Sequence, residues 1–433
     1  MSTATLTPAA PAGAPEPQQV VERPPSWRVP ITLGVFALVA LVAFGLGADA
    51  DETSTFGITL GTDPLLRIPD VALPTRVTAI VLSLGCVALT VVAALRVRQR
   101  RKIPLWATIG FAALWLLAFL VWAIAGNTIS FTGLLRGTVL LAVPLVFGAL
   151  SGVLCERSGV INIAIEGQLL AGAFLSAVVA SLTDSLWLGL IAAPVAGLFV
   201  AILLALFTIR YFVDQIIVGV VLNVLVIGLT GFLYGRVLAA NQDVWNQPGT
   251  FGRIKIPVLG DIPILGPVLF DQSIIVYLMY VTVAVVQVAL FKTRWGLRVR
   301  AVGEHPTAAD TVGIKVNRTR VKNVLLGGLV AGLGGAFFTL GSVGAFGREM
   351  TAGQGFIALA AMIFGRWSPV GALFAALLFG FANSLQSILG IIGTPIPSEF
   401  MLMAPYLATL FAVAGLVGRV RAPAADGQPY VKA

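Results

Sequence analysis

The chain has 433 residues, of which 58% are hydrophobic and only 11% are charged. Soluble domains carry about 25% charged residues, so this chain has too few charges to cover a water-soluble body of its length. Its apolar residues also come in long runs, several of which reach the roughly 20 residues that a bilayer-spanning helix needs. The composition therefore excludes a soluble domain and predicts an all-α, polytopic transmembrane helical bundle.

A net charge of +9 would suggest a nucleic-acid partner in a soluble protein. In a membrane protein the same excess is expected, because Lys and Arg gather in cytoplasmic loops. We see no basic recognition helix and expect no nucleic-acid partner. Cys86 and Cys155 lie in or beside apolar segments and are interpreted as small core residues. His305 is the single histidine and cannot build a metal centre alone.

The first 27 residues are rich in Ala and Pro and lack the early apolar core of a signal peptide, so we interpret residues 1–27 as a disordered cytoplasmic tail. The apolar stretches that follow predict about 10–12 spans of bilayer length. They lie at 30–47, 74–95, 104–125, 133–154, 161–182, 186–209, 216–235, 273–291, 323–342, 370–389 and 401–418.

One further apolar piece, Gly355–Gly365, is too short to cross a bilayer as an upright helix at 1.5 Å per residue. We therefore predict one short broken or re-entrant helix here. Such backbone is tolerated at membrane depth only where protein or water surrounds it.

Two clusters of Lys and Arg, at 96–102 and 292–322, set the orientation. Both belong on the cytoplasmic side by the positive-inside rule, and the acidic loop 48–73 belongs outside. The amino terminus is then cytoplasmic. The basic residues after 418 place the carboxyl terminus there too, which requires that 355–365 counts as a crossing or that one other boundary is wrong.

No enzyme motif is present. The sequence contains no Gly-Lys dipeptide, so the phosphate-binding loop that hydrolyses ATP is absent. We also find no Ser–His–Asp set around the single histidine. These observations favour a transport or scaffold role without its own catalysis.

The largest cytoplasmic loop contains a candidate docking helix. Glu304 lies near its start, Ala308 and Ala309 are small enough for close helix packing, and Gly313 can end it with a left-handed backbone. The pattern of Ala-Ala followed four positions later by Gly resembles the coupling loop of ABC permeases. An ordinary surface helix without a partner is the alternative.

Longer motifs extend this resemblance. Glu156–Gly167 (ERSGVINIAIEG), Asp214–Asn223 and Thr351–Ala361 are similar to the ABC permease family that serves nucleosides, simple sugars and branched-chain amino acids. Asp261–Pro267 (DIPILGP) resembles its nucleoside branch. The similarity runs from about residue 133 to 420, which divides the chain into extra helices at 28–130, a permease core at 131–420 and a cytoplasmic tail at 421–433.

The resemblance implies an ATP-driven importer in the bacterial inner membrane that moves a small hydrophilic solute, most often a nucleoside. It implies a cytoplasmic ATP-binding subunit that holds ATP and Mg²⁺, so this chain has no cofactor of its own. It also implies a second, related permease, a periplasmic or lipid-anchored binding protein and surrounding membrane lipids. A homodimer, simple sugars or branched-chain amino acids, and a secondary transporter driven by an ion gradient remain alternatives.

Polar residues inside apolar spans are candidates for the translocation pathway because an unpaired polar group is costly there. Glu166 and Asn162 are four residues apart and are expected to share one helical face. Asn223 and Asn383 fall within other spans. The alternative for all four is that they bond neighbouring helices and fix packing. We expect Glu166 to act through hydrogen bonds, so that Gln would replace it with little loss.

The short segment carries further pathway candidates. Gly353 and Gly355 flank its start and could let it bend when a gate opens. Phe346 and Phe356 lie beside these glycines and could plug the path.

Overall fold

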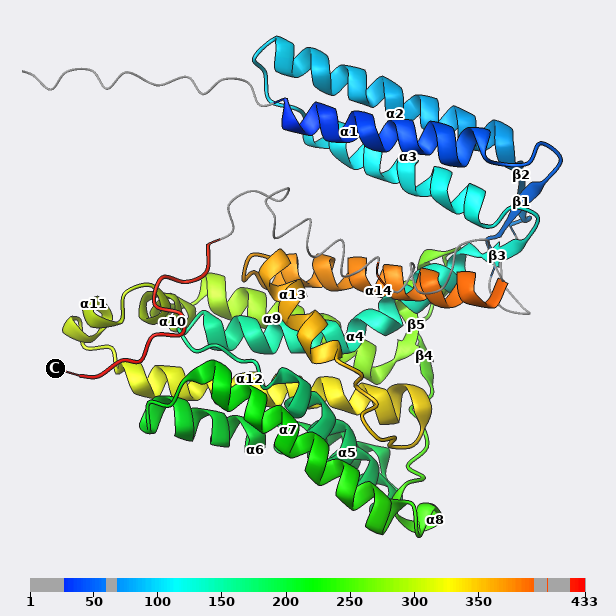
Figure 1. Cartoon of the computed structure of the whole chain (residues 1–433). Coiled ribbons are helices and arrows are strands. Elements are labelled where there is room, and N and C mark those ends of the chain that lie inside the picture. The colour runs from blue at the N-terminus through cyan, green and yellow to red at the C-terminus, as the bar shows by residue number, and fades with distance from the viewer. Residues whose placement is uncertain (1–26, 60–67, 393–402, 404–420, 433) are drawn as a thin grey trace, which may run out of the picture. The chain divides into compact units, whose positions relative to one another are not determined.

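The computed structural model describes residues 27–59, 68–392, 403 and 421–432 (Figure 1). Within these residues, ten helices are long and apolar enough to cross a membrane. They divide into two compact units, one with the helices before residue 126 and one with those after it. The all-α, polytopic prediction is confirmed. The predicted span 401–418 lies outside the described residues, apart from residue 403.

The first unit is a three-helix group. It consists of α1 (Arg28–Val39) with the π-helical extension η1 (Ala40–Leu46), α2 (Thr75–Arg98) and α3 (Leu105–Ala123). Ala37, Cys86 and Phe111 form its small core. Between 22% and 28% of each span is buried. Most of its apolar side chains therefore face outward, as expected for helices surrounded by lipid.

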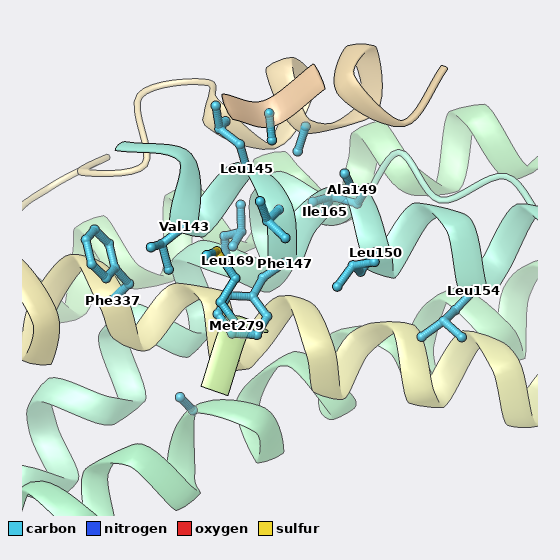
Figure 2. Close-up of a cluster of buried hydrophobic side chains, with 14 of the residues drawn as sticks. Val143, Leu145, Phe147, Ala149, Leu150, Leu154, Ile165, Leu169, Met279 and Phe337 are labelled. Atoms are coloured by element: carbon cyan, nitrogen blue, oxygen red, sulfur yellow. The ribbon is translucent and has the colours of Figure 1, made fainter. Parts of the chain in front are cut away.

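The second unit has α4 at its centre, because 89% of this helix is buried. Figure 2 shows part of the apolar core around it, which Phe147, Leu150, Leu169 and Met279 help to fill. The membrane-length helices of this unit and their extensions are α4 (Phe131–Glu156), α5 (Ile165–Thr183), α6 (Leu186–Ala205) with η2 (Leu206–Arg210), α7 (Gln215–Leu233) with η3 (Tyr234–Leu238), α9 (Ile274–Lys292), α12 (Val316–Ala336) with η6 (Phe337–Val343), and α14 (Pro369–Ile392).

Shorter elements connect these helices. The strand β1 (Thr53–Gly57) pairs in parallel with β3 (Thr128–Ser130), and β4 (Arg253–Lys255) pairs antiparallel with β5 (Asp271–Ser273). The remaining short elements are β2 (Val71–Pro74), α8 (Gln242–Trp245), η4 (Leu259–Asp261), η5 (Gly266–Phe270), α10 (Arg294–Glu304), α11 (Pro306–Thr311) and α13 (Gln354–Phe364).

Glycines allow α6 and α12 to meet backbone to backbone. A Cβ atom placed on Gly197 would lie 2.1 Å from the carbonyl oxygen of Gly328, and one placed on Gly328 would lie 2.3 Å from the side chain of Ala201. Only glycine fits such a crossing, because small residues are what let membrane helices approach closely.

The short helix α13 and the loop before it together run from one end of the second unit to the other. At one end, the backbone N–H of Phe346 donates to Oδ1 of Asn246, which directly follows the short helix α8. At the other, the indole N–H of Trp367 donates to Glu156, the last residue of α4. Residues 346–367 therefore make one complete passage, of which only α13 is helical.

Two predicted boundaries are wrong. The span predicted at 323–342 begins at Val316, so α12 carries its basic residues inside its first two turns. The span predicted from residue 161 begins at Ile165, because residues 157–164 form a turn that returns the chain into the bundle.

Candidate functional site

Several buried polar side chains gather at the start of α5. Glu166 lies in the first turn of α5 and is 4% exposed. Its Oε1 accepts hydrogen bonds from the hydroxyl of Thr351, at 2.6 Å, and from the backbone N–H of Gly353, at 2.8 Å. Its Oε2 accepts from the backbone N–H of Gly355 at 2.6 Å. The carboxylate thus joins α5 to the start of α13.

The negative charge of Glu166 lies at two helix N-termini. It belongs to the first turn of α5, and its two backbone donors, at Gly353 and Gly355, belong to the N-terminus of α13. Unbonded N–H groups and the helix dipole favour an anion at such positions. This arrangement explains how a carboxylate is held inside an apolar bundle by helix ends.

Asn162 belongs to a neighbouring buried amide cluster. Its Nδ2 donates to the hydroxyl of Ser151 at 3.0 Å and to Oε1 of Gln168 at 3.1 Å. All three side chains are fully buried. The prediction that Asn162 and Glu166 share one helical face is wrong, because Asn162 precedes α5 and points to α4 and to a different residue of α5.

Asn223 attaches α7 to the same place. Its Oδ1 accepts from the backbone N–H of Gly167 at 2.8 Å, and its Nδ2 donates to the carbonyl of Ile163 at 2.9 Å. Three predicted polar residues, Asn162, Glu166 and Asn223, therefore gather around the first turn of α5. Each is bonded to protein, so the cluster fixes α4, α7 and α13 against α5.

The other predicted pathway residues lie elsewhere. Asn383 is half-buried on α14 and belongs to no part of this cluster. Phe346 is 2% exposed and its ring packs against Phe174 and Tyr234, with centroids 5.2 Å and 6.1 Å away. Phe356, on α13, is 49% exposed. The two phenylalanines thus do not form one plug in this conformation.

Two glycines at the start of the short segment are required for different structural reasons. Gly353 has a φ of 78°, which favours glycine, and it precedes α13 directly. Gly355 is required for a different reason, because a Cβ atom there would lie 2.4 Å from the backbone nitrogen of Glu166. The hydrogen bond between Glu166 and α13 depends on this close approach.

The basic end of the second unit carries α10 and α11, which extend beyond the other helices in Figure 1. Ala308 is exposed on α11, whereas Ala309 is only 3% exposed. Ala309 packs with Val302, Val316 and Tyr430 of this same chain. Its small side chain is therefore needed for packing within the chain. Of the predicted coupling residues, Glu304, Ala308 and Gly313 are the exposed ones.

Residues 421–432, which we call the C-terminal strap, cover part of this end. The backbone N–H of Ala425 donates to the carbonyl of Gly303, and that of Ala424 donates to the carboxylate of Glu304 at 3.2 Å. Tyr430 completes the small apolar cluster on Ala309. The strap therefore holds α10 and α11 against the membrane helices.

Three ionisable side chains meet where the strap contacts α4 and α12. The carboxyl group of Asp426 lies within hydrogen-bonding reach of Glu156 and close to the guanidinium of Arg320. Arg320 is 2% exposed, and its Nη1 donates to the carbonyl of Gln428 at 2.7 Å. Burial raises the pKa of Asp426 to about 6, although Glu156, the backbone N–H of Gly427 and Arg320 act in the opposite direction.

Several of these residues escape sequence reasoning. Thr351 and Trp367 bond to carboxylates about 200 positions away in the chain, and nothing local indicates such a pairing. Arg320 looks like any cation of a basic loop. Its one sequence signal is its place among Lys and Arg residues that continue directly into an apolar run.

Comparison with known families places these elements in context. The family described as "Branched-chain amino acid transport system / permease component" matches residues 134–417. The chain belongs to this family. The match covers α4 to α14, including the polar cluster at α5 and the α10–α11 loop, and leaves the first three-helix unit outside.

Several curated relatives are named as permeases of ABC transporters. The chain is 42% identical over 304 residues to the guanosine ABC transporter permease protein NupQ of Bacillus subtilis, covering 68% of this chain and 95% of NupQ. It is 40% identical over 298 residues to the nucleoside ABC transporter permease protein NupC of Lactococcus lactis, covering 67% and 93%. A putative glucose ABC transporter permease, TsgC13 of Haloferax volcanii, is 35% identical over 260 residues, covering 59% and 77%.

A second guanosine permease of Bacillus subtilis, NupP, is 26% identical over 299 residues, covering 65% of this chain and 83% of NupP. No solved structure matches the chain. As an ABC permease of this family, the chain is a multi-pass membrane transport subunit. Among the described residues, no group of His, Cys, Asp or Glu side chains could hold a metal ion.

Proposed function

We propose that this permease imports nucleosides. The observation that carries the proposal is the 42% identity to a guanosine permease across nearly the whole length of that relative. The second nucleoside relative, at 40% identity, supports the same class. A nucleoside is small and hydrophilic, so a path through the second unit must offer it polar groups in place of water.

Import of a simple sugar is the alternative, and the 35% identity to the putative glucose permease favours it. Uptake of labelled guanosine, ribose and glucose, in cells with and without this gene, separates the two. Guanosine uptake that depends on the gene supports the proposal. Gene-dependent glucose uptake without guanosine uptake would replace it.

ATP is the proposed energy source, bound by a partner subunit. The family assignment supports this source over an ion gradient. Uptake should persist when the proton gradient is collapsed while ATP stays high, and should stop when ATP is depleted. The reverse result would favour the secondary-transporter alternative.

The partner ATPase is proposed to dock on α10 and α11. Two large apolar side chains are exposed there, Leu297 at 62% and Val312 at 75%. Beside them lies a basic pocket of about 570 Å³ that Arg298, Lys315 and Arg318 help to line. Exposed apolar residues with a polar rim are typical of protein–protein contacts.

Val312→Glu should therefore reduce co-purification of the ATPase while leaving membrane insertion unchanged. A control such as Val281→Glu is unsuitable, because Val281 lies on a membrane-length helix and a charge there is costly in lipid. Gln99→Glu is the control, because Gln99 is exposed, already polar, and lies at the end of α2, outside α10 and α11. Equal recovery of the ATPase with both variants would place the docking surface elsewhere.

We further propose a heterodimer with a related permease, a binding protein that delivers the substrate, and a cytoplasmic location for both chain ends. The support for a heterodimer is that Bacillus subtilis has two guanosine permeases that both resemble this chain. The support for the orientation is the basic end of the second unit, which also binds the C-terminal strap. A cytoplasmic reporter fused after Arg300 should be active, and one fused after Arg253 should be silent.

A further inference from the structure

A groove between α6 and α12 has features that neither the family assignment nor the proposed transport explains. It has a volume of about 710 Å³ and lies between the end of α6, with its extension η2, and the first half of α12. The two helices touch at Gly197 and Gly328, and the groove lies on the basic side of that crossing. We call it the α6–α12 groove.

Charge is confined to one end of this groove. Arg210 closes η2, and Arg318 and Lys322 lie one turn apart on α12. All three side chains are exposed. No acidic residue is among the described residues that line the groove. Three cations without a counterion favour an anion at this end.

The rest of the groove is apolar and lies deeper. Ile202 and Leu206 precede Arg210 on α6 and η2, and Leu325 follows Lys322 on α12. At 1.5 Å per residue, Ile202 lies about 12 Å from Arg210 along the helix axis, toward the middle of this membrane-length helix. Ile202 and Leu206 are 42% and 40% exposed. Because α6 and α12 are membrane-length helices, this apolar part lies at the depth of lipid tails.

One polar atom beside the groove lacks a partner among the described residues. Oδ1 of Asn317 is buried, although Asn317 lines the groove, and no described residue donates a hydrogen bond to it. A buried acceptor without a donor is costly, so rotation of this amide toward the groove is expected when an occupant supplies a hydroxyl or N–H group. Asn317 lies beside Arg318, so this donor must be close to the anionic group.

We propose that the α6–α12 groove binds one anionic phospholipid with a hydroxyl-bearing head group, such as phosphatidylglycerol. The phosphate contacts Arg210, Arg318 and Lys322, a head-group hydroxyl donates to Asn317, and an acyl chain lies along Ile202 and Leu325. Basic pockets between membrane helices are suited to such head groups. A soluble anion would fill the basic end but leave the apolar part of the groove exposed.

The lipid also has a structural consequence for the docking surface. Arg318 and Lys322 line both this groove and the basic pocket beside α11. A phosphate held between them fixes their side chains on the groove side of α12. Occupancy of the groove is therefore expected to alter the charge that α12 presents to a soluble partner.

The test uses the full-length protein purified in mild detergent and titrated with phosphatidylglycerol or phosphatidylcholine under native mass spectrometry. The groove variant is Arg210→Gln/Arg318→Gln/Lys322→Gln. The matched control is Lys292→Gln/Arg294→Gln/Arg298→Gln, which removes the same charge from exposed positions at the same end but outside the groove.

Wild type and control should bind phosphatidylglycerol well above phosphatidylcholine. The groove variant should lose on the order of a hundredfold in phosphatidylglycerol affinity, at about fivefold for each cation near the surface. Equal binding by the groove variant and the control would overturn the proposal, as would equal retention of both lipids by wild type.

A single substitution keeps the test valid if the triple variant fails to fold. Asn317→Leu should weaken phosphatidylglycerol, which has head-group hydroxyls, while leaving phosphatidic acid, which lacks them, unchanged. Soluble glycerol phosphate should not compete with either lipid at equal concentration. Competition by glycerol phosphate would identify the ligand as a soluble anion. Loss of bound lipid from wild type on assembly with its partner subunits would assign the groove to a protein.

Discussion

Oε2 of Glu166 and the backbone nitrogen of Gly355 lie 2.6 Å apart, in a hydrogen bond that joins the first turn of α5 to the first turn of α13. The helix α13 is the only helical part of the passage between Phe346 and Trp367. The position of the start of α13 therefore depends on this carboxylate and on the absence of a side chain at Gly355.

Glu166→Gln is the first prediction, and the structure reverses the expectation from the sequence. Both carboxylate oxygens accept from donors, so an amide group would place its NH₂ against the N–H of Gly353 or Gly355. Each donor left without an acceptor costs about 1–3 kcal/mol. Transport at matched membrane abundance should fall strongly in Glu166→Gln. It should fall less in Thr351→Val, because the backbone N–H groups of Gly353 and Gly355 keep the carboxylate of Glu166 as their acceptor. Full activity of Glu166→Gln would show that these bonds do not position α13.

Gly355→Ala is the second prediction. The added Cβ atom would meet the backbone nitrogen of Glu166 at 2.4 Å and its Cα atom at 2.5 Å. Backbone atoms cannot rotate away as side chains do, so α13 must shift, at a cost of about 1–3 kcal/mol. Thermal stability and uptake should both decrease.

Gly231→Ala is the control for this substitution. Gly231 lies within α7, and nothing lies within 4 Å of a Cβ atom placed there. Ala favours a helix over Gly by up to about 1 kcal/mol, so this variant should be as stable as wild type or more so. Similar losses in both variants would indicate a general sensitivity to added methyl groups.

The sequence is sufficient to predict the spans but not all of their ends. Hydropathy identifies α4 and α14 because their apolar runs have bilayer length. It misses the first two turns of α12, since Arg318, Arg320 and Lys322 make that stretch look like a loop. The helix continues there because its packing and the C-terminal strap provide partners, one of which is the carbonyl of Gln428 for Arg320.

The polar site is predictable in composition but not in connection. Glu166, Asn162 and Asn223 stand out because polar residues are rare within apolar spans. Their partners come from distant segments of the chain, such as Thr351 for Glu166. Ala309 shows the same limit, since Tyr430 covers it from more than 100 positions away. Periodicity and propensity are local signals, so they carry no information on such pairs.

Ala308 and Ala309 should respond differently to a larger side chain, which is the third prediction. Ala309→Leu should displace Tyr430, because Ala309 is buried in the cluster with Val302 and Val316. Hydrogen exchange at residues 421–432 should then increase. Ala308→Leu, on the exposed face of α11, should leave that exchange unchanged and act only on binding of the ATPase. Unchanged exchange in Ala309→Leu would contradict the intramolecular role of this alanine.

Docking of the C-terminal strap should depend on pH, which is the fourth prediction. Burial raises the pKa of Asp426 from 3.8 to about 6 in the docked strap. The groups that face it are Glu156 from α4 and Arg320 from α12. A group whose pKa is raised binds more protons when docked, so docking is most favourable at low pH and weakens as pH rises from about 4 to 6.

Hydrogen exchange at residues 421–432, corrected for the intrinsic pH dependence of exchange, measures this effect directly. Protection should be higher at a pH of about 5 than at about 7.5, by about tenfold, since only the unit between pH 5 and the raised pKa of about 6 lies in this interval and each pKa unit corresponds to tenfold. Asp426→Asn should keep the strap docked at both pH values, because the amide never carries the charge that burial disfavours. Asp310→Asn is the control. Its carboxylate lies 3.7 Å from the exposed Lys432 and beside the hydroxyl of Tyr430, and an amide there keeps an acceptor for that hydroxyl. A wild-type strap with equal protection at both pH values would show that Asp426 does not control docking.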